Sequence, residues 1–336
     1  ILLHVLCVQT APCGRRGPDG GGPDGGGPMA GGPEEGLRYL LLEPGSEAWT
    51  EGAVSINDTS GAVGRTLGQS SEVAFVFYND QSPVEPRAAL GRSSGHTKGA
   101  VVVDKTQGFW LVHSTPHFPP PREAGHFSYP DTGLINGQSF LCVTFPLERF
   151  LAIGEQLHIN QPHVFDCQVP EALASLLPTL STLCHKLRPS AFTAPPPLSA
   201  GGTPFISFAK GAAFNNDLYH SWVAPALGTP LLVQFWVRST GVLPSNCSGA
   251  WSVLNIERLS PGGSAFSTSL DHSKWAASPE GAQAGGGWVC VGDINRNEAE
   301  ERRGGGTVCQ RDPRVWKAYR SAALQCQDCE GRTTTC

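Results

Sequence analysis

Short apolar runs separated by turn-forming residues recur along most of the chain, and they limit it to folds built from several short strands. Runs rich in Val, Leu and Phe predict strands at residues 73–80, 99–104, 108–114, 139–145, 229–237, 251–259 and 287–294. Patterns with helical spacing occupy residues 146–157, 215–227 and 313–326. Strands and helices mixed in both halves predict an α/β (α+β) fold, made of mixed β-sheets flanked by helices.

The N-terminal segment has a composition unlike the rest of the chain. Residues 17–33 contain thirteen Gly or Pro in seventeen positions, including two copies of GPDGG. Such a segment has little apolar surface to bury, so we expect residues 1–36 to be disordered, as a signal-peptide remnant or a mis-predicted first exon. A Pro-rich stretch at 186–204 predicts a linker, which divides the folded part into residues 37–190 and 191–336.

Charge and cysteine content indicate the conditions under which the protein works. The formal net charge is -5 with His neutral, which repels nucleic acid at neutral pH, but protonation of the ten His residues would make it positive in acid. Eleven Cys and two glycosylation sequons, at Asn57 and Asn246, indicate the oxidising secretory pathway. No apolar run is long enough to span a membrane. Cys326 and Cys329 have CxxC spacing, but no second pair accompanies them, so no metal site is predicted.

The tripeptide pattern His-x-Lys occurs twice, at His96–Lys98 and at His272–Lys274. On a strand, residues i and i+2 point to the same face, so each His can act on the same target as its Lys. An ammonium group can hold phosphate oxygens while an imidazole attacks phosphorus or transfers a proton. Two facing pairs would supply a nucleophile and an acid without a metal. The alternative is two polar tripeptides on unrelated surface loops.

A faint internal repeat surrounds the two motifs. In each half a His-x-Lys pair is followed by a Trp-led apolar run, a Gly and a Cys. These positions are His96, Trp110, Gly137 and Cys142 in the first half, and His272, Trp288, Gly304 and Cys309 in the second. Two halves of one site would account for this repeat.

The segments GHTKG, GFWLVHSTPHFPPP, DHSKW, CVGDINRN and RRGGGTVC occur in an order that resembles the deoxyribonuclease II family. The resemblance covers about residues 37–330. That family is similar to the phospholipase D superfamily, in which two pseudo-symmetric halves each supply one His-x-Lys to a shared site. The resemblance implies an acid endonuclease of the lysosome or the secreted fraction. It would hydrolyse double-stranded DNA without metal or other cofactor and leave 3′-phosphate ends.

The resemblance also assigns roles to residues. His96 would be the nucleophile and His272 the general acid, although these roles could be reversed, and Lys98 and Lys274 would bind phosphate. Further positions carried over are His113 and Asn295, which would contact the substrate. For His113 a place in the core is an equally good interpretation. Arg302 and Arg303 could contact the DNA backbone, but a solvated charge run is the favoured interpretation.

The family pattern implies three disulfides, Cys290–Cys309, Cys247–Cys329 and Cys167–Cys184. Cys142 would pair with a cysteine near the mature N-terminus, here Cys7 or Cys13. The strand with which family members begin is replaced by the Gly/Pro repeat, so we expect the sheet to lack that strand and the fold to lose stability.

Two other functions remain open from the sequence. The altered N-terminus could belong to a secreted or lysosomal nucleic-acid-binding protein that has lost activity. A phospholipase D-like phosphodiesterase acting on another substrate, such as a lipid or a nucleic-acid end, would also use two His-x-Lys pairs.

Overall fold

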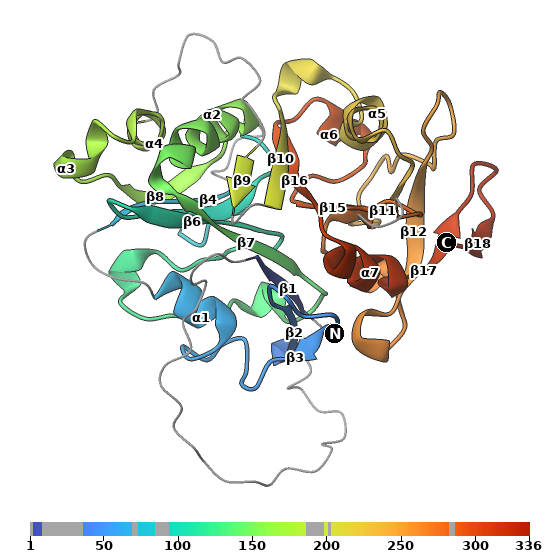
Figure 1. The fold of residues 1–336 in the computed structure, drawn as a ribbon, viewed down its shortest axis with the longest axis horizontal. Coiled ribbons are helices and arrows are strands. Elements are labelled where there is room, and N and C mark those ends of the chain that lie inside the picture. The colour runs from blue at the N-terminus through green and yellow to red at the C-terminus, as the bar shows by residue number, and fades with distance from the viewer. Residues whose placement is uncertain are drawn as a thin grey trace, which may run out of the picture.

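The computed structural model describes residues 3–8, 36–68, 73–84, 94–185, 198–200, 203–281 and 286–336. Its strands form two mixed sheets, one from residues 3–168 and the other from residues 198–335, and helices lie against both (Figure 1). The architecture is therefore α+β, as the alternation of strand and helix patterns predicts.

The first sheet has the strand order β3-β2-β1-β7-β6-β5-β4-β8. β1 pairs in parallel with both β2 and β7, and the remaining neighbours are antiparallel. The strands are β1 (Leu3–Val8), β2 (Tyr39–Leu42), β3 (Thr50–Glu51), β4 (Ala74–Asn79), β5 (Lys98–Val103), β6 (Gln107–His113), β7 (Ser139–Pro146) and β8 (Val164–Gln168).

The second sheet has the order β18-β17-β12-β11-β14-β15-β16-β10-β9, with β13 paired to β12. The strands are β9 (Leu198–Ala200), β10 (Thr203–Lys210), β11 (Leu231–Gln234), β12 (Val253–Leu259), β13 (Phe266–Ser267), β14 (Trp275–Ala277), β15 (Trp288–Gly292), β16 (Gly305–Arg311), β17 (Ala323–Gln327) and β18 (Thr333–Thr335).

Helices cover both faces of each sheet, with α2 and α4 opposite α1 in the first half and α5 opposite α7 in the second (Figure 1). The α-helices are α1 (Ala62–Leu67), α2 (Phe150–Asn160), α3 (Glu171–Ala174), α4 (Pro178–Cys184), α5 (Ala224–Leu227), α6 (Glu298–Glu301) and α7 (Pro313–Ala322). A π-helical turn, Tyr219–Val223, leads into α5. Short 3-10 turns occur at Arg122–Ala124, Asp131–Gly133, Leu147–Arg149, Ala212–Phe214, Pro261–Gly263 and Thr268–Leu270.

The prediction that the N-terminal strand is missing is wrong. Residues Leu3–Val8 form β1, which lies between β2 and β7 in the first sheet. A strand with parallel neighbours on both sides is apolar along most of its length, and the run Leu3–Val8, polar only at His4, resembles the core of a signal peptide. The prediction of disorder is therefore wrong for residues 3–8, and for residues 9–35 it lies outside the described part of the chain.

Both halves contribute side chains to one large apolar core. Phe145 on β7 and Phe205 on β10 are fully buried, and their ring centroids lie 5.9 Å apart in an edge-to-face contact. The same cluster includes Ile153 of α2, Trp275 of β14 and Tyr319 of α7. Burial between the sheets therefore fixes the position of one half relative to the other.

We expect Phe205→Ala to lower the free energy of unfolding by about 3–5 kcal/mol, because it removes a buried ring and leaves a cavity between the sheets. Urea denaturation followed by tryptophan fluorescence measures this loss. Leu151→Ala is the control, since Leu151 is 44% exposed and its truncation should change stability by about 0.5 kcal/mol or less. Equal effects of the two substitutions would show that the contact between Phe145 and Phe205 does not stabilise the protein.

Candidate active site

The two His-x-Lys motifs lie at the boundary between the halves, each immediately before or at the beginning of a strand. Lys98 is the first residue of β5, and Lys274 directly precedes β14. The backbone N–H of His96 donates to the carbonyl of Gly304 at 2.8 Å, and that of His272 donates to the carbonyl of Gly137 at 2.8 Å. Each motif is thus attached to a glycine of the opposite half. These two glycines, Gly137 and Gly304, occupy equivalent positions in the sequence repeat.

The close approach of backbone segments explains why glycines occupy these positions. A Cβ atom on Gly95 would lie 1.9 Å from the carbonyl oxygen of Asn160, and one on Gly304 would lie 2.3 Å from the same oxygen. A side chain at Gly95 would push the first motif away from the end of α2, and one at Gly304 would push the second half away from the same point.

His96 is buried and lies between two carboxylates. Its Nδ1 is 2.8 Å from Oε1 of Glu300, and its Nε2 is 3.9 Å from Oδ2 of Asp80. Burial and the nearby charge of Lys98 outweigh the two carboxylates and lower the pKa of His96 below its ordinary value. The contact with Glu300 places the proton on Nδ1 of the neutral ring, so that Nε2 carries the lone pair.

The turn that carries Glu300 is built locally. The side chain of Asn297 caps α6 by accepting a hydrogen bond from the backbone N–H of Glu300 at 3.0 Å. Buried Lys210 donates its ammonium protons to the carbonyls of Glu300 at 2.6 Å and Arg303 at 2.6 Å. These contacts hold the Glu300 carboxylate against the imidazole of His96.

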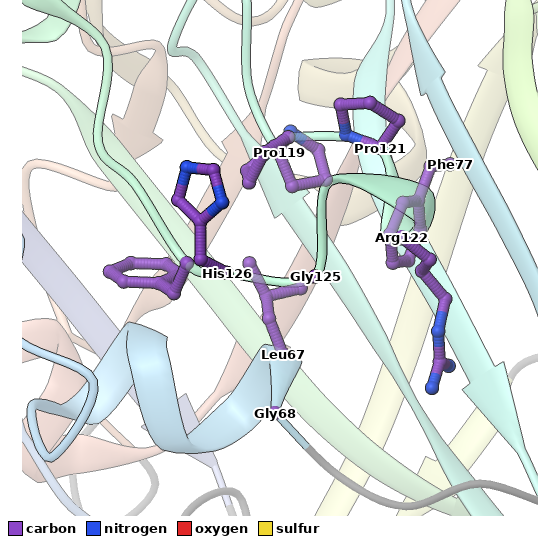
Figure 2. Close-up of a pocket in the computed structure, with 10 residues that line it drawn as sticks. Leu67, Gly68, Phe77, Pro119, Pro121, Arg122, Gly125 and His126 are labelled. Carbon is purple, nitrogen blue, oxygen red and sulfur yellow. The ribbon is translucent and has the colours of Figure 1, made fainter.

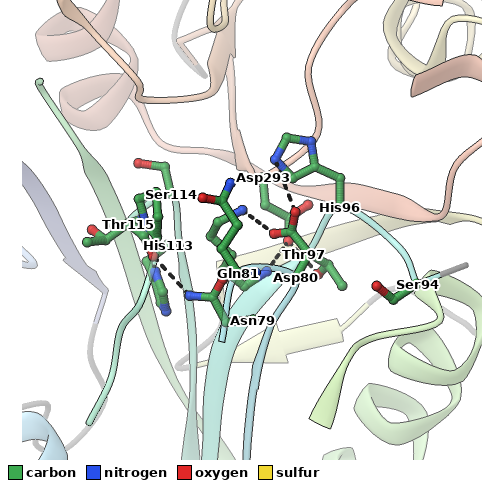
Figure 3. A network of polar contacts seen from close by, with 12 residues as sticks. Asn79, Asp80, Gln81, Ser94, His96, Thr97, His113, Ser114, Thr115 and Asp293 are labelled. Atoms are coloured by element: carbon green, nitrogen blue, oxygen red, sulfur yellow. Dashed lines mark hydrogen bonds and ion pairs between the residues drawn. The ribbon is translucent and has the colours of Figure 1, made fainter. Parts of the chain in front are cut away.

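Lys98 and Arg303 neutralise the carboxylate of Asp80, which follows β4. The Lys98 ammonium donates to Oδ1 of Asp80, and the Arg303 guanidinium donates to Oδ2 at 3.0 Å. Burial opposes ionisation of Asp80, but Lys98, His96 and Arg303 together hold its pKa well below the ordinary range. Figure 3 shows Asp80, His96 and Asp293 close together, next to the ends of strands.

Asp293 connects the first motif to the second half from inside the protein. Its carboxylate accepts hydrogen bonds from the Thr97 hydroxyl, from the backbone N–H of Lys98 at 3.1 Å and from that of Gly306 at 3.3 Å. Burial raises the pKa of Asp293 to about 6, although these donors favour its ionised form.

His272 differs from His96 because, among the residues that the structure describes, no carboxylate makes a hydrogen bond to it. Its Nδ1 donates to the carbonyl of Ser114 at 2.9 Å, and the ammonium of Lys274 lies 3.0 Å from the same nitrogen and 3.2 Å from Nε2. Burial and the positive charges of Lys274, Lys98 and His96 lower the pKa of His272 well below its ordinary value.

Asn295 links the two sides of the site. Its side-chain amide nitrogen is 3.5 Å from Nδ1 of His96, and its Oδ1 accepts a hydrogen bond from the backbone N–H of Trp236 at 3.1 Å. The ring of Trp236 packs edge-on against His272, with 5.2 Å between the ring centroids. The amide of Asn295 is therefore within reach of the space between the two imidazoles.

His113 lies deeper than the other predicted site residues. It is fully buried on β6, stacks on Phe140 at 5.4 Å and meets the edge of Phe118 at 5.3 Å. Its Nδ1 accepts from the backbone N–H of Thr115 at 3.2 Å. This placement agrees with the interpretation of His113 as a core residue, and its contact with substrate stays a prediction.

Sequence reasoning missed three charged residues of the site: Asp80, Glu300 and Arg303. The interpretation of Arg303 as part of a solvated charge run is wrong, because its guanidinium contacts Asp80 and lies 3.5 Å from Glu300. Arg302 is exposed, as expected for that interpretation. Glu300 is 204 residues from His96 along the chain, so no local pattern could have paired them.

The four described disulfides include the three pairs that the sequence resemblance implies. These are Cys167–Cys184, Cys247–Cys329, Cys290–Cys309 and, in addition, Cys326–Cys336. Cys142 is also disulfide-bonded, and the predicted partners Cys7 and Cys13 lie outside the described side chains. Of the sequon residues, Asn57 is exposed and Asn246 is partly exposed.

A separate pocket of about 250 Å³ lies between the end of α1 and the Pro-rich loop before residue 128. Figure 2 shows it lined by Leu67, Phe77, Pro121, Arg122 and His126. None of the residues predicted for the site contributes to its walls. In the described part of the chain, no three His, Cys, Asp or Glu side chains are grouped to hold a metal ion. The described helices include none long and apolar enough to cross a membrane.

Comparison with known proteins identifies the class to which this fold and site belong. The family model described as Deoxyribonuclease II matches residues 27–329. The chain therefore belongs to the deoxyribonuclease II family and is a hydrolase of the nuclease class.

Curated relatives span most of the chain. Deoxyribonuclease-2-alpha of Rattus norvegicus is 44% identical over 306 residues, which cover 88% of this chain and 86% of the relative. Deoxyribonuclease-2-beta of Homo sapiens is 37% identical over 311 residues, covering 88% and 84%. Plancitoxin-1 of Acanthaster planci is 34% identical over 308 residues, again covering 88% and 84%.

Proposed function

We propose that the protein is an acid endodeoxyribonuclease with a phospholipase D-like arrangement, in which residues 37–190 and 191–336 each supply one His-x-Lys. It hydrolyses phosphodiesters of double-stranded DNA without metal and leaves 3′-phosphate ends. The observation that carries the proposal is the crosswise attachment of His96 to Gly304 and of His272 to Gly137, which brings both motifs to one boundary.

The unequal surroundings of the two histidines support a division of labour. Glu300 accepts the Nδ1 proton of His96, which leaves the Nε2 lone pair for attack on phosphorus. His272 has cations around it instead of carboxylates, so it gives up a proton readily once protonated. His96 is therefore the nucleophile and His272 the general acid.

The reaction proceeds in two displacements at phosphorus. Nε2 of His96 forms a bond to phosphorus, the bond from phosphorus to the 5′-oxygen breaks, and His272 donates its proton to that oxygen. The resulting phosphohistidine carries the strand that ends in a 3′-oxygen. Neutral His272 then takes a proton from water, whose oxygen displaces His96 and yields a 3′-phosphate.

Positive side chains supply the charge stabilisation in this proposal. The Lys274 ammonium contacts only the ring and carbonyl of His272 among the described hydrogen bonds, so it can bind a phosphate oxygen. Lys98 and Arg303 lie beside the other motif, where both are paired with Asp80. Asn295 would donate its amide protons to the remaining oxygen.

Activity should rise as the pH falls. The general acid must be protonated, and burial with Lys274, Lys98 and His96 keeps the pKa of His272 well below its ordinary value. Above that pKa, and where His96 is already neutral, the protonated fraction of His272, and with it kcat, falls about tenfold per pH unit. Lys274→Gln removes a charge that lowers this pKa, so the alkaline limb of the profile should move to higher pH while kcat decreases. A Lys105→Gln control should leave the profile unchanged, and an unshifted limb in Lys274→Gln would contradict the assignment.

Glu300→Gln should lower kcat on the order of 100-fold, because an amide cannot stabilise the positive charge that His96 acquires during attack. It should also lower the pKa of His96, since the Glu300 carboxylate raises it. Kinetics across pH measure both effects. Glu298→Gln, on the same short helix, is the matched control, and equal losses in both variants would mean that Glu300 only supports the fold.

Nicking of closed-circular plasmid at about pH 5 with EDTA present tests the function directly. Nicking without metal supports the acid endonuclease, whereas retention of DNA without nicking would favour a binding protein that has lost activity. Lack of nicking combined with cleavage of a lipid phosphodiester or of DNA ends would favour another phospholipase D-like enzyme.

The cysteine pattern supports a location in the lysosome or outside the cell, because disulfides persist in oxidising compartments. The side chains of Asn57 and Asn246 are accessible enough to carry glycans under this proposal.

A further inference from the structure

The two halves differ at one structurally equivalent position beside the histidines. In the first half Asn79 pairs with Lys98, so Asp80 lies beside the middle residue of His-x-Lys. In the second half Gln234 pairs with Trp275, which puts Trp236 beside the middle residue of the second motif. An indole therefore stands next to His272 where a carboxylate stands next to His96.

Trp236 has defined contacts on its backbone and ring and remains partly exposed. Its backbone N–H is bonded to Asn295 at 3.1 Å, and its ring meets the His272 ring at 64° with 5.2 Å between centroids. The guanidinium carbon of Arg238, an exposed residue, lies 5.5 Å from the centroid of the indole. The guanidinium of Arg238 therefore lies over an indole that already contacts a proposed catalytic residue.

The surface next to His272 also exposes apolar side chains. Leu270 is 39% exposed and Ile135 is 67% exposed, although most large apolar side chains of the described chain are buried. The backbone N–H of Gly137 donates to the carbonyl of Leu270 at 2.9 Å, so the segment that carries Ile135 lies beside the segment that carries Leu270. An indole and a guanidinium beside a proposed catalytic histidine are groups that bind a nucleobase and its phosphate.

We propose that Trp236 and Arg238 bind the nucleotide whose 5′-oxygen is the leaving group. Its base stacks on the indole, and the guanidinium moves from the ring to the next phosphate along the strand. This inference rests on the proposed function, because it places the leaving group on the side of His272. Since purines offer a larger face than pyrimidines, the enzyme should prefer a purine directly after the scissile phosphate.

An end-labelled single-stranded oligonucleotide tests the stacking contact. Cleavage is compared at the same linkage when it is followed by adenosine and when it is followed by an abasic tetrahydrofuran residue. The wild-type protein should cut the abasic linkage about tenfold more slowly, because stacking on an aromatic side chain is lost. Trp236→Ala should cut both linkages at one rate, and Trp236→Phe should keep part of the difference.

The ratio of the cleavage rates at the adenosine and abasic linkages distinguishes a base-binding role of Trp236 from a purely structural one. A purely structural role for Trp236 would lower both rates equally and leave the tenfold ratio intact, which would overturn the inference. No loss at the abasic linkage in the wild-type protein would overturn it as well. Nicking of closed-circular plasmid without cleavage of the oligonucleotide at any linkage would overturn the inference alone. Absence of cleavage of both substrates by the wild-type protein would refute the proposed function itself.

Arg238→Ala tests the phosphate contact independently. It should raise KM with little change in kcat and reduce the slope of log KM against log salt by about 0.7, the contribution of one phosphate on a single strand. Arg258→Ala, an exposed arginine on β12, is the matched control and should leave that slope unchanged. Equal slopes for wild type and Arg238→Ala would rule out the proposed contact.

Discussion

His96→Ala is expected to abolish DNA cleavage, with a decrease in kcat of about 10⁴-fold or more, because the substitution removes the nucleophile. The loss should be the same for every leaving group, since no phosphohistidine can form. Plasmid nicking measures cleavage with the 5′-oxygen of DNA as leaving group. Hydrolysis of thymidine 3′-(4-nitrophenyl phosphate) measures cleavage with nitrophenolate in its place.

Folding must be separated from chemistry in this variant, because His96 is buried against Glu300. Thermal denaturation and secretion of His96→Ala should remain close to those of the wild-type protein. His126→Ala, which replaces an exposed histidine outside the site, should keep full activity. Turnover of either substrate by His96→Ala at more than about one hundredth of the wild-type rate would contradict a nucleophilic role.

His272→Ala is expected to lower kcat on DNA by about 10²–10⁴-fold, because the 5′-oxygen must then leave without a proton. The first displacement on the nitrophenyl substrate should survive, since nitrophenolate leaves without protonation. A burst of nitrophenolate followed by slow turnover is the expected record. In that variant no imidazole at position 272 activates the water that hydrolyses the intermediate.

The opposite result in the two variants would contradict this prediction. Should His272→Ala lose the burst while His96→Ala keeps it, the two histidines would exchange roles. Failure of His272→Ala to be secreted would instead indicate that His272 stabilises the fold through its contacts with Ser114 and Gly137.

Sequence patterns predicted the strands whose side chains are buried on both faces. β4, β5 and β7 coincide with Val- and Phe-rich runs, because strands in the interior of a sheet are apolar along most of their length. The same property concealed β1, whose run resembles part of a signal peptide. β16 begins in a glycine run that is typical of a loop, and Gly306 is required because its backbone lies against the carbonyl of Phe208.

The His-x-Lys motifs were visible in the sequence because each is a local pattern. Their surroundings were not, because Asp80, Glu300 and Arg303 reach the first motif from other strands and loops. The repeat correctly paired Gly137 with Gly304, although nothing in it indicated that each glycine binds the histidine of the other half. The difference between Asp80 and Trp236 also becomes visible only through strand register.

The covalent intermediate provides the most direct test of a single site shared by both histidines. His272→Ala is mixed with thymidine 3′-(4-nitrophenyl phosphate), denatured in alkali to preserve phosphohistidine, and digested for peptide mass spectrometry. The account predicts a thymidine 3′-phosphoryl adduct on His96. An adduct on any other residue, or continued turnover with no adduct on His96, would contradict it.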